Sequence, residues 1–112
     1  PPQEEIIGAY AARYDNFCWC SIGIGYGYED LAAGFYSFPC MTTQDARGAG
    51  PCTYDETTGR LLGEMVDDND PVVDRVMIDV VYSGIDRFTG RYAVEVGGAA
   101  CDEGDLEMVR AR

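Results

Sequence analysis

The side chains that could do chemistry in this chain are carboxylates, thiols and phenols, because histidine and lysine are both absent. Twenty acidic residues, five cysteines and eight tyrosines stand beside eight basic residues, all of them arginines. The chain therefore cannot build a Ser-His-Asp triad, a Cys-His pair, a His-ligated zinc site, a Schiff base or a GK[ST] phosphate loop. Acid-base catalysis would fall to two carboxylates, as in a small glycan hydrolase, and no pair stands out among the twenty.

Five cysteines in 112 residues predict a disulfide framework and hence a secreted, extracellular protein. Cys40 and Cys52 flank a loop that contains Gly and Pro, and we predict that they pair. Cys101 is predicted to bond Cys20 or Cys18, which point to one side of a strand and need different partners. The odd count leaves one thiol, which could link two copies into a disulfide-bonded dimer. Paired CxxC spacing is missing, so we expect no metal on these thiols.

The acidic run 67–70 invites comparison with a calcium-binding loop. Counted from Asp67, the fifth residue is Pro71, and Val72 stands at the sixth position, where an EF-hand loop needs Gly. We therefore expect a solvated turn, and no metal or cofactor.

An aromatic cluster beside a run of alternating glycines is the best candidate for a recognition surface, because Tyr and Trp bring contact area with few rotors. The alternative is that these rings pack in the core. The candidate binding residues are Trp19, Tyr26, Tyr28, Phe35, Tyr36 and Arg47.

The net charge of −12 and the pI near 4.1 disfavour nucleic acid and anionic membranes as partners, because both are bound mainly through Lys and Arg. Even the longest uncharged stretches, residues 16–28 and 31–44, are well short of the ~20 apolar residues that span a bilayer. We expect no nucleic-acid or membrane partner.

The first predicted element is a helix over residues 3–14. Acidic residues occupy its first turn, and Ile6, Tyr10 and Tyr14 recur at helical spacing. The pattern then changes to alternation, which predicts a strand over 17–28 with three glycines on one face. The part of a strand face that carries only glycines lets another element approach closely, or permits the strand to bend strongly.

The rest of the chain is less regular. Residues 29–38 could hold one or two helical turns, and residues 39–51 are predicted to form a loop. Residues 71–82 fit a helix or a strand, and their six β-branched residues favour the strand. A short final strand is predicted over 106–109, after a turn at 102–105.

The pattern D-x-x-T-G-R occurs twice, at 55–60 and 86–91. An Asp that bonds the backbone ahead of it, followed by a left-handed Gly, is typical of a hairpin loop. We therefore predict two hairpins, closed by Gly59 and Gly90. Gly104 is expected in a loosely ordered stretch.

Together these patterns predict a single domain over 1–112 with an α+β fold. An N-terminal helix would pack on a mostly antiparallel sheet of about five strands, stabilised by disulfides.

The short chain, its few cysteines, its missing catalytic set, its aromatic cluster and its acidic surface resemble the small secreted effector-like proteins of plant-associated filamentous fungi. The resemblance implies a non-enzymatic virulence protein that acts by binding a host protein. A carboxylate-dependent hydrolase and a structural secreted protein are the alternatives.

Overall fold

The computed structural model of this protein describes residues 1–14, 18–27, 30–36, 47–67 and 75–111. Within these ranges the chain forms one short helix and eight strands. They are α1 (Gln3–Ile6), β1 (Gly8–Tyr14), β2 (Cys18–Tyr26), β3 (Leu31–Tyr36), β4 (Arg47–Asp55), β5 (Arg60–Asp67), β6 (Arg75–Tyr82), β7 (Arg87–Val96) and β8 (Ala99–Arg110).

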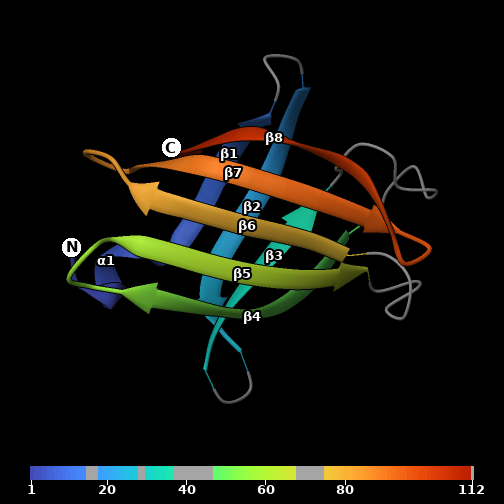
Figure 1. The fold of residues 1–112 in the computed structure, drawn as a ribbon. Helices are drawn as coiled ribbons and strands as arrows, with labels where there is room; N and C mark the ends of the chain where they lie inside the picture. The colour runs from blue at the N-terminus through green and yellow to red at the C-terminus, as the bar shows by residue number, and fades with distance from the viewer. Residues whose placement is uncertain (15–17, 28–29, 37–46, 68–74, 112) are drawn as a thin grey trace.

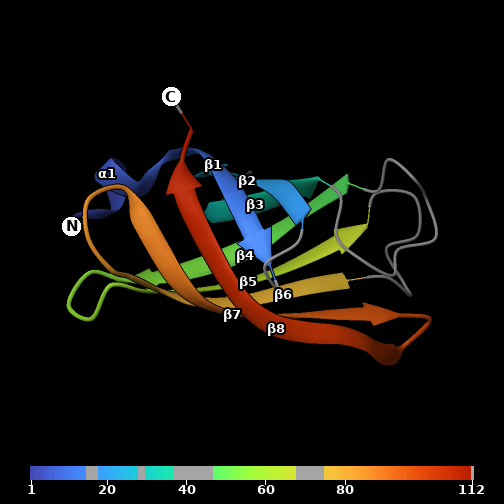
Figure 2. The same ribbon diagram turned by 90° about the horizontal axis from the view of Figure 1, so that it is seen from above.

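The strands form a closed barrel in which each strand pairs antiparallel with its neighbour in sequence, and β1 pairs with β8 to close the ring (Figures 1 and 2). The predicted α+β fold is therefore wrong. What was expected to be a helix packed on a sheet is a sheet closed on itself, with α1 at one end of the barrel (Figure 2).

The predicted helix over 3–14 ends after Ile6, because the chain turns at Gly8 into β1. Gly8 has a φ of 151°, and a Cβ there would lie 2.4 Å from Nη1 of Arg110. In β1, Tyr10 and Ala12 alternate with exposed neighbours and are buried. Pairing with β2 and β8 thus overrides the helical spacing of the aromatic residues.

Two strands were predicted correctly from the sequence, as far as the described residues extend, one from alternation and the other from its β-branched residues. In β2, Ile22 and Ile24 face the core while the positions between them face outward. In β6, Val76, Ile78 and Val80 are buried in the same alternating way. The strand interpretation of 71–82 is confirmed from residue 75 onward.

Two other segments differ from prediction. The helical turns expected within 29–38 are replaced by β3, and β4 begins inside the expected loop, at Arg47. The acidic stretch 102–105 is not a turn but the middle of β8, and Gly104 is buried there. The predicted strand over 106–109 is confirmed as the second half of this longer strand.

The two D-x-x-T-G-R segments have different structures. Gly59 has a φ of 77° and closes the β4–β5 turn, where Asp55 Oδ1 accepts hydrogen bonds from the amides of Thr57 and Thr58. This hairpin is confirmed. The second is wrong, because Gly90 lies inside β7 and pairs with Val80.

The core fills the barrel with the inward-facing side chains of all eight strands and with Ile6 from α1. Phe88 makes edge-to-face contacts with Tyr10 and Tyr82, at ring-centroid distances of 5.6 and 5.3 Å. The largest fully buried side chains are Tyr10, Phe88, Ile6, Ile22, Leu61, Met65, Met108, Val76, Val80 and Val94.

No helix in the described ranges is long and apolar enough to cross a membrane.

Candidate binding surface

The predicted binding residues separate into surface and core. Tyr26 is 63% exposed, Tyr36 is 44% exposed and Arg47 is exposed. Phe35 is buried in the core, so its placement on a recognition surface is wrong. Tyr28 lies outside the described residues. The backbone of Trp19 lies in β2, but its side chain is not among those described.

The three exposed residues border one part of the barrel. Tyr36 and Arg47 are directly opposite each other on β3 and β4. Tyr26, at the end of β2, lines a hollow on the outer surface with Gly25 and Ala32. The structure therefore brings part of the predicted cluster together around the outer side of β2, β3 and β4.

Between these residues lies a small-residue face, the outer side of β1–β4. Its central row runs straight across the four strands, because Ala9 pairs with Gly23, Gly23 with Gly34, and Gly34 with Ala49. The middle of this outer side is uncharged, and the exposed charged residues Arg13, Asp30 and Arg47 lie around it. The members of the small-residue face are Ala9, Ala11, Ser21, Gly23, Gly25, Gly27, Ala32, Gly34, Ala49 and Pro51.

Two hollows of about 550 and 450 Å³ lie on this face and share Gly27, Ala32 and Ala49. The sequence predicted the glycine side of β2. It did not show that alanines and a proline from three other strands extend the same face, because that depends on the pairing register.

Two of the four glycines of this face are not required by packing inside the described fold, whereas a Cβ on Gly27 would lie 3.0 Å from Cβ of Ala32. A Cβ placed on Gly23 or Gly25 would meet no atom within 4 Å. By contrast, a Cβ on Gly50 would lie 1.9 Å from the carbonyl oxygen of Glu64, so that glycine is needed for the close approach of β4 and β5. Glycine weakens a strand. Its use at positions with open space around them therefore points to a contact with a group other than the described residues.

The opposite outer half, formed by β5–β8, carries ion pairs between neighbouring strands. Arg60 donates two hydrogen bonds to the carboxylate of Asp79, and this contact lowers the pKa of Asp79. The remaining pairs on this half are Arg75 with Glu64 at 2.6 Å and with Glu95 at 3.5 Å, Arg87 with Glu107, and Arg91 with Asp105 at 3.0 Å. The ion pairs between strands thus lie on one outer half of the barrel, whereas the middle of the other half carries small, uncharged residues.

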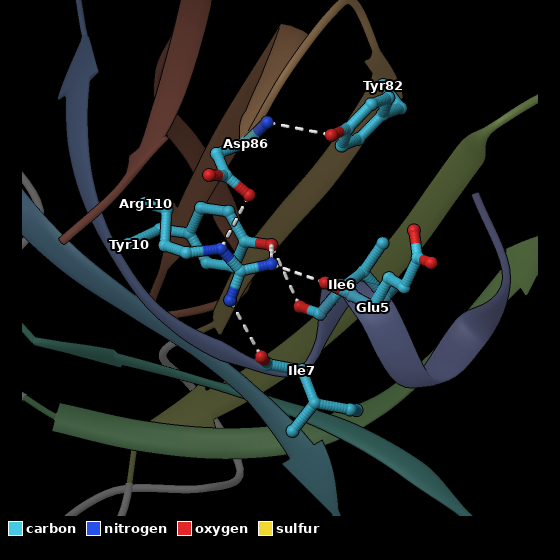
Figure 3. A network of polar contacts seen from close by, with 7 residues as sticks. All are labelled: Glu5, Ile6, Ile7, Tyr10, Tyr82, Asp86 and Arg110. Atoms are coloured by element: carbon cyan, nitrogen blue, oxygen red, sulfur yellow. Dashed lines mark hydrogen bonds and ion pairs between the residues drawn. The ribbon is translucent and has the colours of Figure 1, made fainter. Parts of the chain in front are cut away.

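A network of polar contacts centred on Arg110 closes the end of the barrel beside α1 (Figure 3). Its Nε donates to Asp86 at 2.8 Å, its Nη1 donates to the carbonyl of Ile7 at 2.8 Å, and its Nη2 donates to the carbonyl of Glu5. The guanidinium also lies over the ring of Tyr10, 5.1 Å from its centroid.

The network satisfies backbone groups that a short helix leaves without partners. The hydroxyl of Tyr10 donates to the carbonyl of Ile6, so three successive carbonyls at the end of α1 are bound by two side chains. The bond with Asp86 raises the pKa of Arg110, and burial raises the pKa of Tyr10. We assign this network a structural role, and no local pattern in the sequence predicts it.

The cysteines only partly follow the predicted framework. Cys52 is a free thiol buried in the barrel wall, so the predicted Cys40–Cys52 bridge is wrong. Cys101 is disulfide-bonded. Neither Cys20 nor Cys40 has a described side chain, so the Cys20–Cys101 pairing stays a prediction.

Within the described ranges no three Cys, Asp or Glu residues are placed to hold a metal ion. The acidic run that was compared with a calcium loop lies outside these ranges after Asp67.

Comparison of the chain with protein-family models, with curated proteins and with solved structures finds no match.

Proposed function

We propose that this chain is a non-enzymatic binding protein that contacts a protein partner through the small-residue face. The supporting observation is that Gly23 and Gly25 are exposed to open space in the middle of a strand. A flat face of small, uncharged side chains lets a partner approach the sheet backbone closely without desolvating a charge. On a chain of net charge −12 it is the part of the surface best suited to such a contact.

The exposed tyrosines at the border of the small-residue face also support a binding function. Tyr26 and Tyr36 are the two most exposed aromatic residues described, and they lie at the border of the face. Exposed tyrosines beside an apolar centre are typical of recognition surfaces. The effector-like character expected from the sequence makes a secreted protein with a host protein partner our proposal for the biological setting.

Two of the described carboxylates are unsuited to act as the acid that the hydrolase alternative needs. A carboxylate pair needs one acid whose pKa is raised so that it stays protonated. Asp55 and Asp79 instead have lowered pKa values, caused respectively by hydrogen bonds from the Thr57 and Thr58 amides and from Arg60.

The test compares capture of proteins from plant-tissue extract by three immobilised forms of the protein. Gly23→Glu places a carboxylate in the small-residue face at a position with room for it. Val81→Glu places the same group on the charged half, where Val81 is 42% exposed. Melting temperatures of both variants equal to that of wild type would show that both variants fold.

The proposal predicts that wild type and Val81→Glu capture the same protein and that Gly23→Glu does not. It would be contradicted if wild type retained nothing, or if Gly23→Glu retained the protein as well as the control does.

A further inference from the structure

The outer side of β4–β8 holds a groove of about 490 Å³ that is separate from the central row of the small-residue face. Its apolar part is formed by Leu62, Met77 and Ala93, and Leu62 is 40% exposed. The charged residues that line it are Glu64, Asp79, Arg91 and Glu103. An apolar centre with a charged edge is the usual anatomy of a protein-binding site.

The register aligns four of these residues in one row across the barrel. Glu64 pairs with Met77, Met77 with Ala93, and Ala93 with Glu103. All four alternate with the buried row of Gly63, Ile78, Tyr92 and Gly104, so they face outward. The row therefore has a carboxylate at each end and apolar side chains in the middle.

The ion pairs leave excess negative charge around this row. Asp79 is neutralised by Arg60, and Arg91 by Asp105. At the β5 end of the row, Arg75 contacts Glu64 at 2.6 Å and also contacts Glu95 of β7 at 3.5 Å, so two carboxylates share one guanidinium. At the other end, Glu103 has no ion-pair partner among the described residues.

We propose that this groove binds an extended basic peptide segment of a partner protein, with an apolar side chain between two Lys or Arg residues. Three spacings between neighbouring strands separate Glu64 from Glu103, about 14 Å. In an extended peptide, residues i, i+2 and i+4 face the same side, and the outer two are about 13 Å apart. Basic residues at i and i+4 would meet the two carboxylates, and an apolar residue at i+2 would cover Met77 and Ala93.

This inference does not depend on the small-residue face. An experiment that contradicts one of the two proposals therefore leaves the other standing. Because the groove is shallow and the contact small, binding to a short peptide will be weak. The test is therefore an NMR titration of the ¹⁵N-labelled protein with the end-blocked heptapeptide Gly-Lys-Ser-Leu-Ser-Lys-Gly at low salt. Two further peptides serve as controls, one with Glu for both Lys and one with the two Lys adjacent.

We expect saturable shifts of the amide signals around Leu62, Met77, Ala93 and Glu103, and weaker binding as salt is added. Both control peptides should produce smaller shifts. Glu103→Gln should weaken binding about two- to fivefold, as expected for one exposed ion pair. Its matched control is Glu4→Gln, which removes an exposed carboxylate from α1 and should leave binding unchanged.

Three results would overturn the proposal. The first is the absence of saturable shifts in the groove. The second is equal binding of the Lys and Glu peptides. The third is an equal effect of Glu103→Gln and Glu4→Gln.

Discussion

The thiol of Cys52 is held in the barrel wall with only 6% of the residue exposed. Burial raises its pKa to about 11, so almost none of it is thiolate at neutral pH. We expect Cys52 to resist iodoacetamide at pH 8 in the native protein and to react fully in urea. Peptide mapping of the alkylated protein measures this residue separately from the other cysteines, and rapid native labelling of Cys52 would contradict its placement.

The glycines of the barrel differ in what surrounds them. A Cβ on Gly90 would lie 2.1 Å from the backbone oxygen of Asp79, which cannot move aside, whereas a Cβ on Gly23 would meet nothing. Gly90→Ala should therefore destabilise the protein by about 3 kcal/mol. Gly23→Ala should stabilise it by about 0.5 kcal/mol, because alanine loses less backbone freedom on folding.

Urea unfolding of both variants measures the two effects. Equal stability of Gly90→Ala and wild type would show that β6 and β7 do not approach each other as closely as described.

At the scale of elements, the β4–β5 turn carries a charge-dependent contact. Hydrogen bonds from the amides of Thr57 and Thr58 lower the pKa of Asp55. A lowered folded-state pKa stabilises the fold above the unfolded pKa, about 4, and this contribution is lost as the pH falls through the folded value. Asp55→Ala should therefore melt below wild type at pH 7, and the difference should shrink at pH 3.

Thermal melts of both proteins at the two pH values test this prediction. A difference that stays constant or grows on acidification would mean that the Asp55 carboxylate is not bound by the turn.

The attachment of α1 depends on Arg110. Replacing Arg110 by Ala removes hydrogen bonds to Asp86, Ile7 and Glu5 and leaves the partners in a partly buried site. We expect a loss of about 3 kcal/mol in unfolding free energy. Arg91→Ala removes an exposed ion pair and serves as the control, with an expected loss of about 0.5 kcal/mol.

Urea unfolding of both variants and hydrogen exchange of the amides in α1 measure this attachment. Equal losses in the two variants would contradict the role given to the network.

The elements that the sequence predicted correctly share a local cause. Alternation of apolar residues predicts β2, and a high content of β-branched residues predicts β6. The side chain of Asp55 with a left-handed Gly59 predicts a turn, so neighbouring residues are sufficient to find these elements. The β7–β8 turn was equally local, since Gly97 and Gly98 both have positive φ. This Gly-Gly pair is a turn signal that is visible in the sequence, although no turn was predicted from it.

The elements that were missed depend on distant partners. β1 is rich in alanine and fits a helix or a strand, and only its pairing with β2 and β8 decides between them. The same D-x-x-T-G-R letters form a turn at Gly59 and a strand at Gly90, because β6 already pairs with the second segment. Local sequence cannot show which of these environments a segment will meet.

At the scale of the whole molecule, closure of the barrel creates the division of its outer surface. The outward positions of β5–β8 alternate charged residues with a few apolar ones, whereas the middle of the outer side of β1–β4 presents mainly Gly, Ala and Pro. The candidate surface could be predicted only in part, because glycine alternation is visible in the sequence but the four-strand row is not. Of the predicted aromatic residues, Tyr26 and Tyr36 are exposed and Phe35 faces inward, and the side chains of Trp19 and Tyr28 lie outside the described part of the chain.

Pairing of β1 with β8 is the central claim, because it separates a closed barrel from the sheet with a terminal helix that the sequence suggested. The most direct measurement is the pattern of backbone NOEs for residues 8–14. The account predicts cross-strand NOEs that place Ala11 opposite Val109 and Ala12 opposite Met108, with no helical NOEs. Sequential amide–amide NOEs of helical type through 8–14, without contacts to 106–110, would contradict it.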